Sequence, residues 1–227
     1  MRHILLIRHA ESEKNRSGSF SSASDSEPLT AEGRAASDNV ARALRACLKW
    51  GSVEVHAAQS GRAQLTAEHI ADTVQSDVHL HEELRSISLG NRSGATEEDL
   101  ERTDPSFIAD LTLYRSGLLN AYDVRTPPGA EDHYLFERRV NATIAGVVRA
   151  SCAAVVVFVL HRSSLTAALI EIARRHRNYP DSFYGYVVLD LASISSVTFD
   201  DNVLFDMLVN ESAAAFWQRT GTGDFGV

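Results

Sequence analysis

Two pairs of arginine and histidine follow apolar runs that are typical of buried β-strands. Arg8 and His9 come directly after Ile4–Ile7. His161 and Arg162 come directly after a longer apolar run, and small polar residues and a helical pattern follow both pairs. In open α/β sheets, ligands bind at the carboxyl ends of the strands. We therefore expect the two imidazoles at the same edge of one sheet.

A third arginine completes a set of side chains suited to a phosphoryl group. Arg62 lies just inside the predicted helix that follows a short strand. Guanidinium groups bind two phosphate oxygens at once, and a neutral imidazole can attack phosphorus to form an intermediate that water hydrolyses. A second, protonated imidazole can stabilise the oxygens of the transferring group. This chemistry predicts His9 as the nucleophile, with Arg8, Arg62 and His161 around the phosphoryl group.

The rest of the chain alternates strands and helices, which is typical of an α/β fold with helices on both faces of one sheet. The predicted strands span residues 4–7, 53–56, 78–80, 153–160, 186–191, 194–199 and 203–209. The predicted helices span residues 31–49, 61–74, 131–151 and 163–176, the first two with Thr30 and Ser60 as N-caps. We expect a three-layer α/β/α sandwich with a mostly parallel central sheet.

No repeat or linker interrupts this pattern, so residues 1–227 are predicted to form a single domain. The serine-rich stretch 12–27 predicts a mobile surface loop. Prolines and glycines break residues 91–130 into short helices and loops, which we expect to form a partial lid over the pocket. Residues 218–227 contain three glycines and predict a flexible tail.

Charge limits the partners of this protein. Lys and Arg total 22 and Asp and Glu total 30, which gives a formal net charge of −8. This balance argues against nucleic acid or an anionic membrane as the main partner. The N-terminal apolar run is too short for a signal peptide or a membrane span, so we expect a soluble, cytoplasmic protein.

The remaining candidate ligands predict neither a disulfide nor a metal site. Cys47 and Cys152 are expected to be two buried thiols. His79 and His81 alternate on a predicted strand, but no third metal ligand lies within reach in the sequence.

Several motifs, in order along the chain, resemble those of the histidine phosphatase superfamily, also called phosphoglycerate mutase-like. That family opens with an apolar strand and Arg-His-Gly-Glu-Thr, and residues 5–15 read LLIRHAESEKN. Its Pro-Leu-Thr-x-x-Gly-Arg-x-x-Ala motif is similar to PLTAEGRAAS at residues 28–37, and its Arg-Ala-x-x-Thr-Ala-Glu motif occurs within residues 58–68. Its Pro-Gly-Gly-Glu-Ser and Val-Val-Ser-His-Gly-Gly motifs are similar to PGAED at residues 128–132 and FVLHRS at residues 158–163.

The resemblance implies a role for each matching residue. His9 would be the phosphorylated nucleophile, Arg8 and Arg62 would hold phosphate oxygens, and His161 would be the second phosphate-binding imidazole. The resemblance also implies a metal-independent phosphoric monoester hydrolase of the phosphatase branch, with no cofactor.

Two further roles follow from the same resemblance. Asn15 would be an auxiliary phosphate contact, and Glu131 would support the pocket from the start of its helix.

Two positions depart from the family pattern. The family's general acid is usually a glutamate in Leu-x-Glu shortly before a glycine, but residues 84–90 read LRSISLG, which puts Ser86 at that position. The other branch of the family places an aspartate after the second histidine, where this chain has Arg162. Neither usual proton donor is present. Arg162 replaces a usual glycine, and we expect it to contact a second anionic group of the substrate.

Three explanations of the missing acid stay open. Glu82, Glu83 or Glu131 could reach the leaving oxygen, with Glu83 as the first choice. Alternatively, the substrate has a good leaving group, such as that of a phosphoanhydride or acyl phosphate. In the third explanation, the protein binds phosphate but has lost most turnover. A positioned general acid contributes on the order of 10²–10⁴ in rate, so the choice matters.

The sequence therefore predicts a phosphatase that acts on a small phosphorylated metabolite through a phosphohistidine on His9. The alternatives are a non-enzymatic phosphoryl-ligand binding protein on the same fold and a phosphotransferase or mutase. Residues 12–27 and 91–130 are expected to set specificity, and a homodimer is the default expectation for the assembly.

Overall fold

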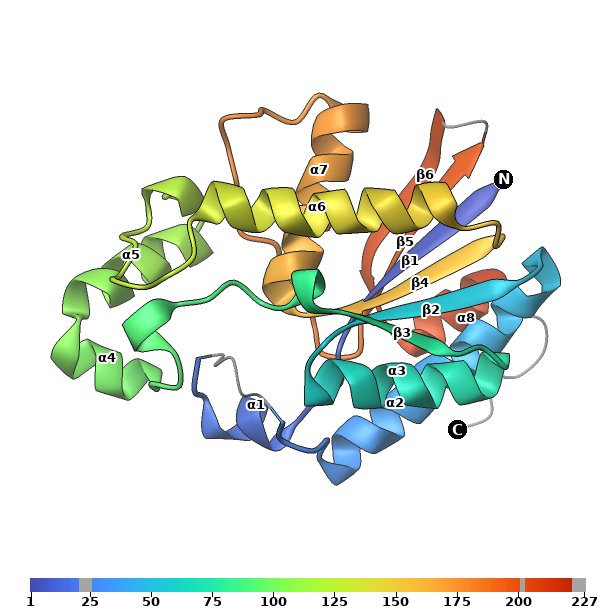
Figure 1. The fold of residues 1–227 in the computed structure, drawn as a ribbon, viewed down its shortest axis with the longest axis horizontal. Coiled ribbons are helices and arrows are strands. Elements are labelled where there is room, and N and C mark those ends of the chain that lie inside the picture. The colour runs from blue at the N-terminus through green and yellow to red at the C-terminus, as the bar shows by residue number, and fades with distance from the viewer. Residues whose placement is uncertain (21–25, 201–202, 222–227) are drawn as a thin grey trace.

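A six-stranded sheet forms the centre of the protein, and helices cover both of its faces (Figure 1). The structure is a computed structural model that describes residues 1–20, 26–200 and 203–221. The strand order is β3-β2-β4-β1-β5-β6. The strands are β1 (Arg2–Arg8), β2 (Val53–Ala58), β3 (Val78–His81), β4 (Val155–Leu160), β5 (Ile194–Asp200) and β6 (Val203–Glu211).

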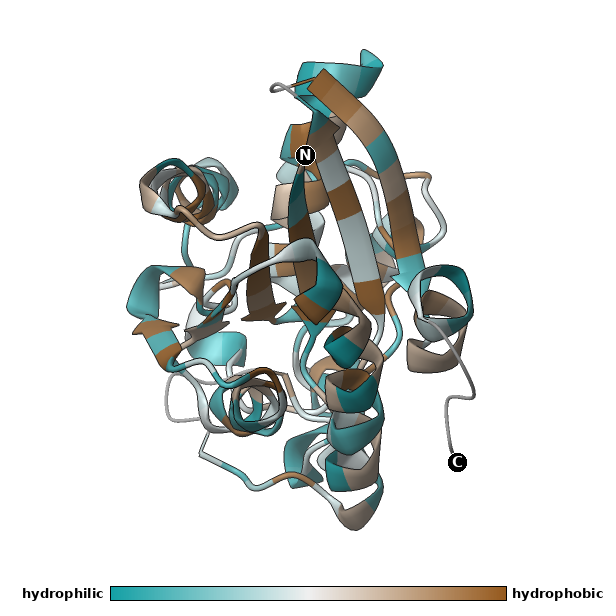
Figure 2. Cartoon of the chain, turned by 90° about the vertical axis from the view of Figure 1, so that its right-hand side faces the viewer, coloured by the Kyte–Doolittle hydropathy of each residue, from teal (hydrophilic) through white to brown (hydrophobic). Residues whose placement is uncertain are grey.

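The first four strands are parallel to one another, and β5 runs antiparallel to both of its neighbours. All six residues of β4 are buried, which explains their continuous Val, Phe and Leu sequence. Figure 2 shows hydrophobic colouring concentrated in these central strands. In the register of β1 and β4, Arg8 lies opposite Leu160. His9 and His161 therefore leave the sheet side by side, as predicted.

The longer helices form the two outer layers (Figure 1). On one face lie α6 (His133–Ala150) and α7 (Arg162–Arg177), and on the other lie α2 (Ala31–Leu44), α3 (Gly61–Val74) and α8 (Ala213–Thr220). The predicted three-layer α/β/α sandwich with a mostly parallel sheet is confirmed. No helix within the described ranges is both long and apolar enough to cross a bilayer.

The start of α2 shows how local sequence builds the frame of the site. The Thr30 side chain accepts a hydrogen bond from Gly33 N, as an N-cap does, and its hydroxyl donates to Glu11. A Cβ atom at position 33 would lie 2.0 Å from the carbonyl oxygen of Glu11, so only glycine fits there. The helix therefore packs directly against the chain that follows His9.

Residues 91–130 form short helices beyond the carboxyl ends of the strands, as their prolines and glycines predict (Figure 1). They comprise α4 (Glu97–Thr103), α5 (Pro105–Arg115) and a 3-10 turn, Ala121–Asp123. Phe20 N donates to Ala95 O at 2.8 Å and Gly94 N donates to Phe20 O at 3.0 Å. The two segments that we expected to set specificity are thus joined to each other.

The prediction of a strand at residues 186–191 was wrong. This segment pairs with no strand among the described residues and instead crosses the end of the sheet, where Leu189 O accepts a hydrogen bond from Arg8. Nearby, Tyr184 N donates to the Asn120 side chain. Leu189 is buried by such tertiary contacts and not by pairing with another strand, whereas Val188 is exposed.

Other boundaries also differ from the predictions. Residues 12–27 contain a helix, α1 (Glu13–Ser17), which ends at Gly18 in a left-handed conformation. The predicted helix 31–49 ends earlier and continues as a 3-10 helix, Arg45–Trp50. The predicted tail begins too early because α8 extends to the buried Thr220, and residues 222–227 lie outside the described part. Cys47 is buried as predicted, but Cys152 is exposed.

Three histidines meet where β2 pairs with β3. His56 Nδ1 lies 3.0 Å from His81 Nε2, and the ring centroids of His56 and His79 are 5.1 Å apart. Burial and the neighbouring His81 and His79 lower the pKa of His56. The described part of the chain contains no group of three or more His, Cys, Asp or Glu residues that could hold a metal ion.

This cluster predicts a loss of stability in acid. His56 stays neutral in the folded protein but binds a proton in the unfolded chain below about pH 6.5. Stability is therefore fully present above that pH and is lost as the pH falls towards the lowered pKa of the folded state. His56→Phe keeps a ring beside Phe158 and removes this titration. We expect the variant to lose roughly 1–2 kcal/mol less stability than wild type between pH 7 and pH 5 in urea unfolding. Equal pH dependence of the two proteins would contradict the assignment.

Candidate active site

A cavity of about 290 Å³ lies at the carboxyl ends of β1 and β4. Its lining includes the cationic side chains Arg8, Lys14, Arg62 and Arg162. Among the described residues that line it, none is an aspartate or a glutamate. In a chain with a net charge of −8, this concentration of positive charge marks a site for an anion.

His9 is held so that one ring nitrogen faces the cavity lining. Its Nδ1 lies 2.8 Å from the carbonyl oxygen of Ala10, and Arg62 Nε donates to its Nε2 at 3.1 Å. These partners fix the tautomer, with the proton on Nδ1 and a lone pair on Nε2. Burial, then His161 and Arg62, lower the pKa of His9 well below its ordinary value. The imidazole is therefore neutral at physiological pH, as a nucleophile must be.

Arg62 reaches His9 from the first turn of α3. Its carbonyl oxygen accepts from Thr66 Oγ1 at 2.7 Å, and the same hydroxyl accepts from Ala10 N at 3.0 Å. Thr66 thus ties the helix to the loop that carries His9. Arg62 itself is buried, so packing restricts its side-chain rotamers and fixes the direction of its guanidinium group.

His161 lies beside His9, with 5.2 Å between the ring centroids. Its Nε2 is 3.0 Å from Ser60 Oγ, and its Nδ1 is buried without a hydrogen-bond partner among the described residues. This contact explains why Ser60, although at the N-cap position of α3, makes no side-chain cap. Burial, Arg62 and Arg8 lower the pKa of His161, so it is neutral where we had expected a protonated ring.

Arg8 and Arg162 form a second cationic group at this edge. Arg8 Nη1 donates to Leu189 O at 2.5 Å, while its Nε is buried with no partner in the described part of the chain. Burial and the nearby Arg162 lower the pKa of Arg8 to about 10. Arg162 Nη1 donates to the Tyr186 hydroxyl at 2.9 Å. Arg8 therefore has buried donor capacity that an anion could use.

The helix α1 brings two more residues to the cavity. Asn15 Oδ1 accepts from Ser12 N and Ser12 Oγ, so only its amide nitrogen could serve an anion. Lys14, which the sequence analysis missed, is buried and lines the cavity. Its position next to Asn15, a predicted phosphate contact, could have indicated a role at the site. However, Lys14 reaches the cavity because residues 13–17 form a helix, which the sequence analysis did not predict.

Glu131 acts behind the wall of the cavity and does not line it. It precedes α6 instead of starting it, since the helix begins at His133 with Asp132 as N-cap. Its carboxylate pairs with Arg139 through contacts of 2.5 and 2.7 Å. Arg139 also donates to the carbonyl oxygens of Glu83, Arg85 and Ser86. Glu131 therefore positions the chain around Ser86 through Arg139.

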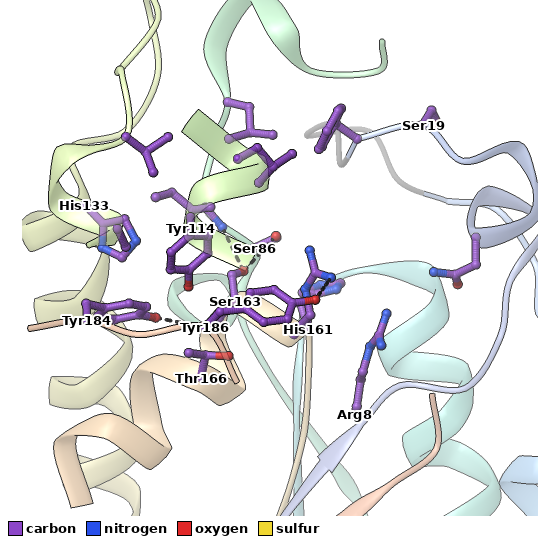
Figure 3. A pocket seen from close by; sticks show the side chains of 18 of the residues that line it. Arg8, Ser19, Ser86, Tyr114, His133, His161, Ser163, Thr166, Tyr184 and Tyr186 are labelled. Carbon is purple, nitrogen blue, oxygen red and sulfur yellow. Dashed lines mark hydrogen bonds between the residues drawn. The ribbon is translucent and has the colours of Figure 1, made fainter. Parts of the chain in front are cut away.

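The structure places Ser86, and not Glu83, at the cavity. Ser86 Oγ lies 2.9 Å from Ser163 Oγ, and both side chains line the wall (Figure 3). Glu82 and Glu83 are exposed on a 3-10 turn, and neither lines the cavity. Our first choice for a replacement acid is therefore turned away from the site.

The family model of the histidine phosphatase superfamily (branch 1) matches residues 4–211 of this chain. No curated protein matches it in sequence.

Solved structures share its fold. An alpha-ribazole phosphatase from Shigella flexneri is 23% identical, with a TM-score of 0.72 and coverage of 93% of this chain and 96% of that one. A mycobacterial glucosyl-3-phosphoglycerate phosphatase in complex with VO3 is 21% identical, with a TM-score of 0.74 and coverage of 93% and 100%. A phosphoserine phosphatase mutant from Entamoeba histolytica, in complex with phosphoserine, is 19% identical, with a TM-score of 0.68 and coverage of 93% and 98%.

Proposed function

Because the chain belongs to the histidine phosphatase superfamily, we propose that it hydrolyses a small phosphate monoester through a phosphohistidine on His9. The observation that carries the proposal is the state of His9, which is neutral, fixed through Nδ1 and surrounded by cationic donors. The phosphatases among its structural neighbours support the same reaction class.

The geometry suggests how each residue would act. A phosphoryl oxygen, as a stronger acceptor, would take the Arg62 hydrogen bond from His9 Nε2 and free its lone pair for attack on phosphorus. Arg8 and Arg62 would hold the oxygens as the P–O bond breaks. The negative phosphoryl group would raise the proton affinity of His161, which could then donate to it. No metal is required, because these side chains supply the positive charge.

Other parts of the proposal concern the surroundings of this site. Residues 91–130 would act as a partial lid, and Ser86 would stand where the family's glutamate acts. Arg162, next to Arg8, would contact an anionic group of the substrate. We also propose that the protein forms a homodimer, which light scattering would test. We propose a cytoplasmic location, which cell fractionation would test.

A phosphoryl-ligand binding protein is the second candidate, and the absence of any carboxylate among the described lining residues favours it. Without a proton donor, esters of poor leaving groups would bind but turn over slowly.

The pH profile of phosphate release tests the first proposal. With p-nitrophenyl phosphate and excess EDTA, we expect turnover whose kcat/KM holds below pH 6.5, because kcat/KM reports the free enzyme and the pKa of His9 is lowered. The rate should fall only as the pH passes through that lowered value and His9 gains a proton. The protonation of the substrate phosphate is measured separately by ³¹P NMR, and the rates are corrected for it. Loss of activity in EDTA, or an enzyme titration at or above pH 6.5, would contradict the proposal.

A further inference from the structure

We propose that the substrate is the phosphate monoester of a phenol, bound through its aromatic ring. This inference rests on the proposed function and adds the class of leaving group. It follows from two separate properties of the cavity. One is the composition of the wall opposite Arg8, and the other is the absence of a proton-donating carboxyl group from the described lining.

The far wall is apolar. Residues 91–130 contribute to the described lining only side chains that are apolar or aromatic, namely Phe107, Leu111, Tyr114, Ala121 and Val124. Phe20 joins them from the loop after α1, in an edge-to-face contact with Phe107 at 5.9 Å between centroids. A flat apolar group is the ligand that such a wall binds best.

The tyrosines of this wall offer ring faces and not free hydroxyls. Tyr114 donates its hydroxyl to Gly185 O at 3.3 Å, and Tyr184 donates to Ser163 O at 3.4 Å. His133 packs edge-to-face on Tyr184 at 4.4 Å between centroids, and its Nδ1 faces the Glu137 carboxylate at 3.6 Å. Figure 3 shows these three side chains on the side of the cavity opposite Arg8. The hydroxyls of Tyr114 and Tyr184 are therefore both engaged with backbone carbonyl oxygens, and His133 Nδ1 has only its 3.6 Å contact with Glu137.

A sugar or other polyol fits this wall poorly. Each buried hydroxyl of the ligand needs a hydrogen-bond partner, and burial without one is costly. Phe107, Leu111 and Val124 provide none. An aromatic ring makes no such demand.

The lack of a proton-donating carboxyl group in the described lining favours the same class of substrate. Ser86, which stands at the position of the family's acid, shares a hydrogen bond of 2.9 Å with the hydroxyl of Ser163. A serine hydroxyl donates a hydrogen bond but does not release its proton near neutral pH. An aliphatic alcohol, whose pKa is close to that of water and far above that of a phenol, leaves poorly without a proton. A phenol, with a pKa of about 10, can leave as the anion.

The proposed reaction balances without an acid. The lone pair of His9 Nε2 forms the N–P bond, and the P–O bond breaks with its electron pair going to the phenolate. Water then attacks phosphorus, the N–P electron pair returns to Nε2, and both protons of the water leave on dihydrogen phosphate. The phenolate takes its proton from solvent afterwards.

Binding of inert phosphonates tests ring recognition independently of turnover. We expect benzylphosphonate to bind at least about 10-fold more tightly than methylphosphonate in calorimetry, as contacts of several apolar carbons imply. Leu111→Ala should weaken benzylphosphonate by roughly 5- to 20-fold and leave methylphosphonate unchanged. Leu113→Ala is the matched control, because Leu113 lies on the same helix, is exposed and does not line the cavity. Equal binding of the two phosphonates would overturn the inference.

Turnover then separates this inference from the proposed function. We expect kcat/KM for phenyl phosphate to exceed that for glycerol phosphate by about 100-fold or more. Hydrolysis of glycerol phosphate as fast as, or faster than, phenyl phosphate would overturn the substrate class while the phosphatase function stood. No hydrolysis of either ester, with the benzylphosphonate preference intact, would contradict the phosphatase function and support the ring site.

Discussion

Replacing His9 by alanine is expected to lower phosphate release by at least about 10⁴-fold, the scale seen when a covalent nucleophile is removed. The reason is that Nε2 is the one nitrogen of His9 that carries a lone pair toward the phosphoryl site, since Nδ1 is committed to Ala10 O. The measurement is steady-state release from p-nitrophenyl phosphate beside the wild-type protein.

The fold should survive this change, so the result can be interpreted. His9 lies at the cavity and not inside the apolar core, and its removal takes one imidazole away from Arg62 and His161. His69→Ala, on the side of α3 that faces α2, is the matched control and should retain full activity, because His69 pairs with Asp38 and does not line the cavity. Inorganic phosphate should still bind His9→Ala. Wild-type activity in that variant would exclude the phosphohistidine mechanism.

Replacing Ser86 by glutamate is expected to raise kcat/KM for glycerol phosphate by about 10²-fold, since it supplies the missing proton donor. Phenyl phosphate, whose leaving group needs little help, should gain far less. Ser86→Gln is the control, because it adds the same bulk without a proton to give. An equal effect of glutamate and glutamine, or a gain that is the same for both esters, would contradict the assignment of position 86.

The structure indicates that a glutamate at position 86 would be available as a proton donor and would not be held in an ion pair with Arg139. Arg139 donates to the backbone carbonyl oxygen of Ser86, but Glu131 already pairs with its guanidinium, and the carbonyl oxygens of Glu83 and Arg85 also accept from it. A new carboxylate at position 86 would therefore find Arg139 already occupied. Its open direction is toward Ser163 and the cavity.

The sequence predicted the sheet and the end of the cavity that carries His9 and His161, because both depend on local pattern. The continuous apolar run of β4 is typical of a strand covered on both faces, and His161 directly follows it at the carboxyl edge. The same argument placed His9 at the end of β1.

The remaining parts depend on contacts between distant segments. Tyr186–Leu191 has the composition of a strand but is held by Arg8 across the sheet end. Glu83 is three residues from Ser86, yet the 3-10 turn sends its side chain to solvent. The apolar wall formed by residues 91–130 has no periodicity, because α5 and the turns around it present single side chains from different directions.

The concentration of cations in the cavity also affects how long the protein persists. Arg8 and Arg162 lie close together without a carboxylate in the described lining, and burial, followed by the charge of Arg162, lowers the pKa of Arg8. An anion bound there would offset the repulsion between the two guanidinium groups. At a free anion concentration [L], binding stabilises the folded chain by RT ln(1 + [L]/Kd), about 2.7 kcal/mol at 100 times Kd. Proteases act on the unfolded fraction. We therefore expect the cellular abundance of the protein to rise with the supply of the phosphorylated ligand proposed above.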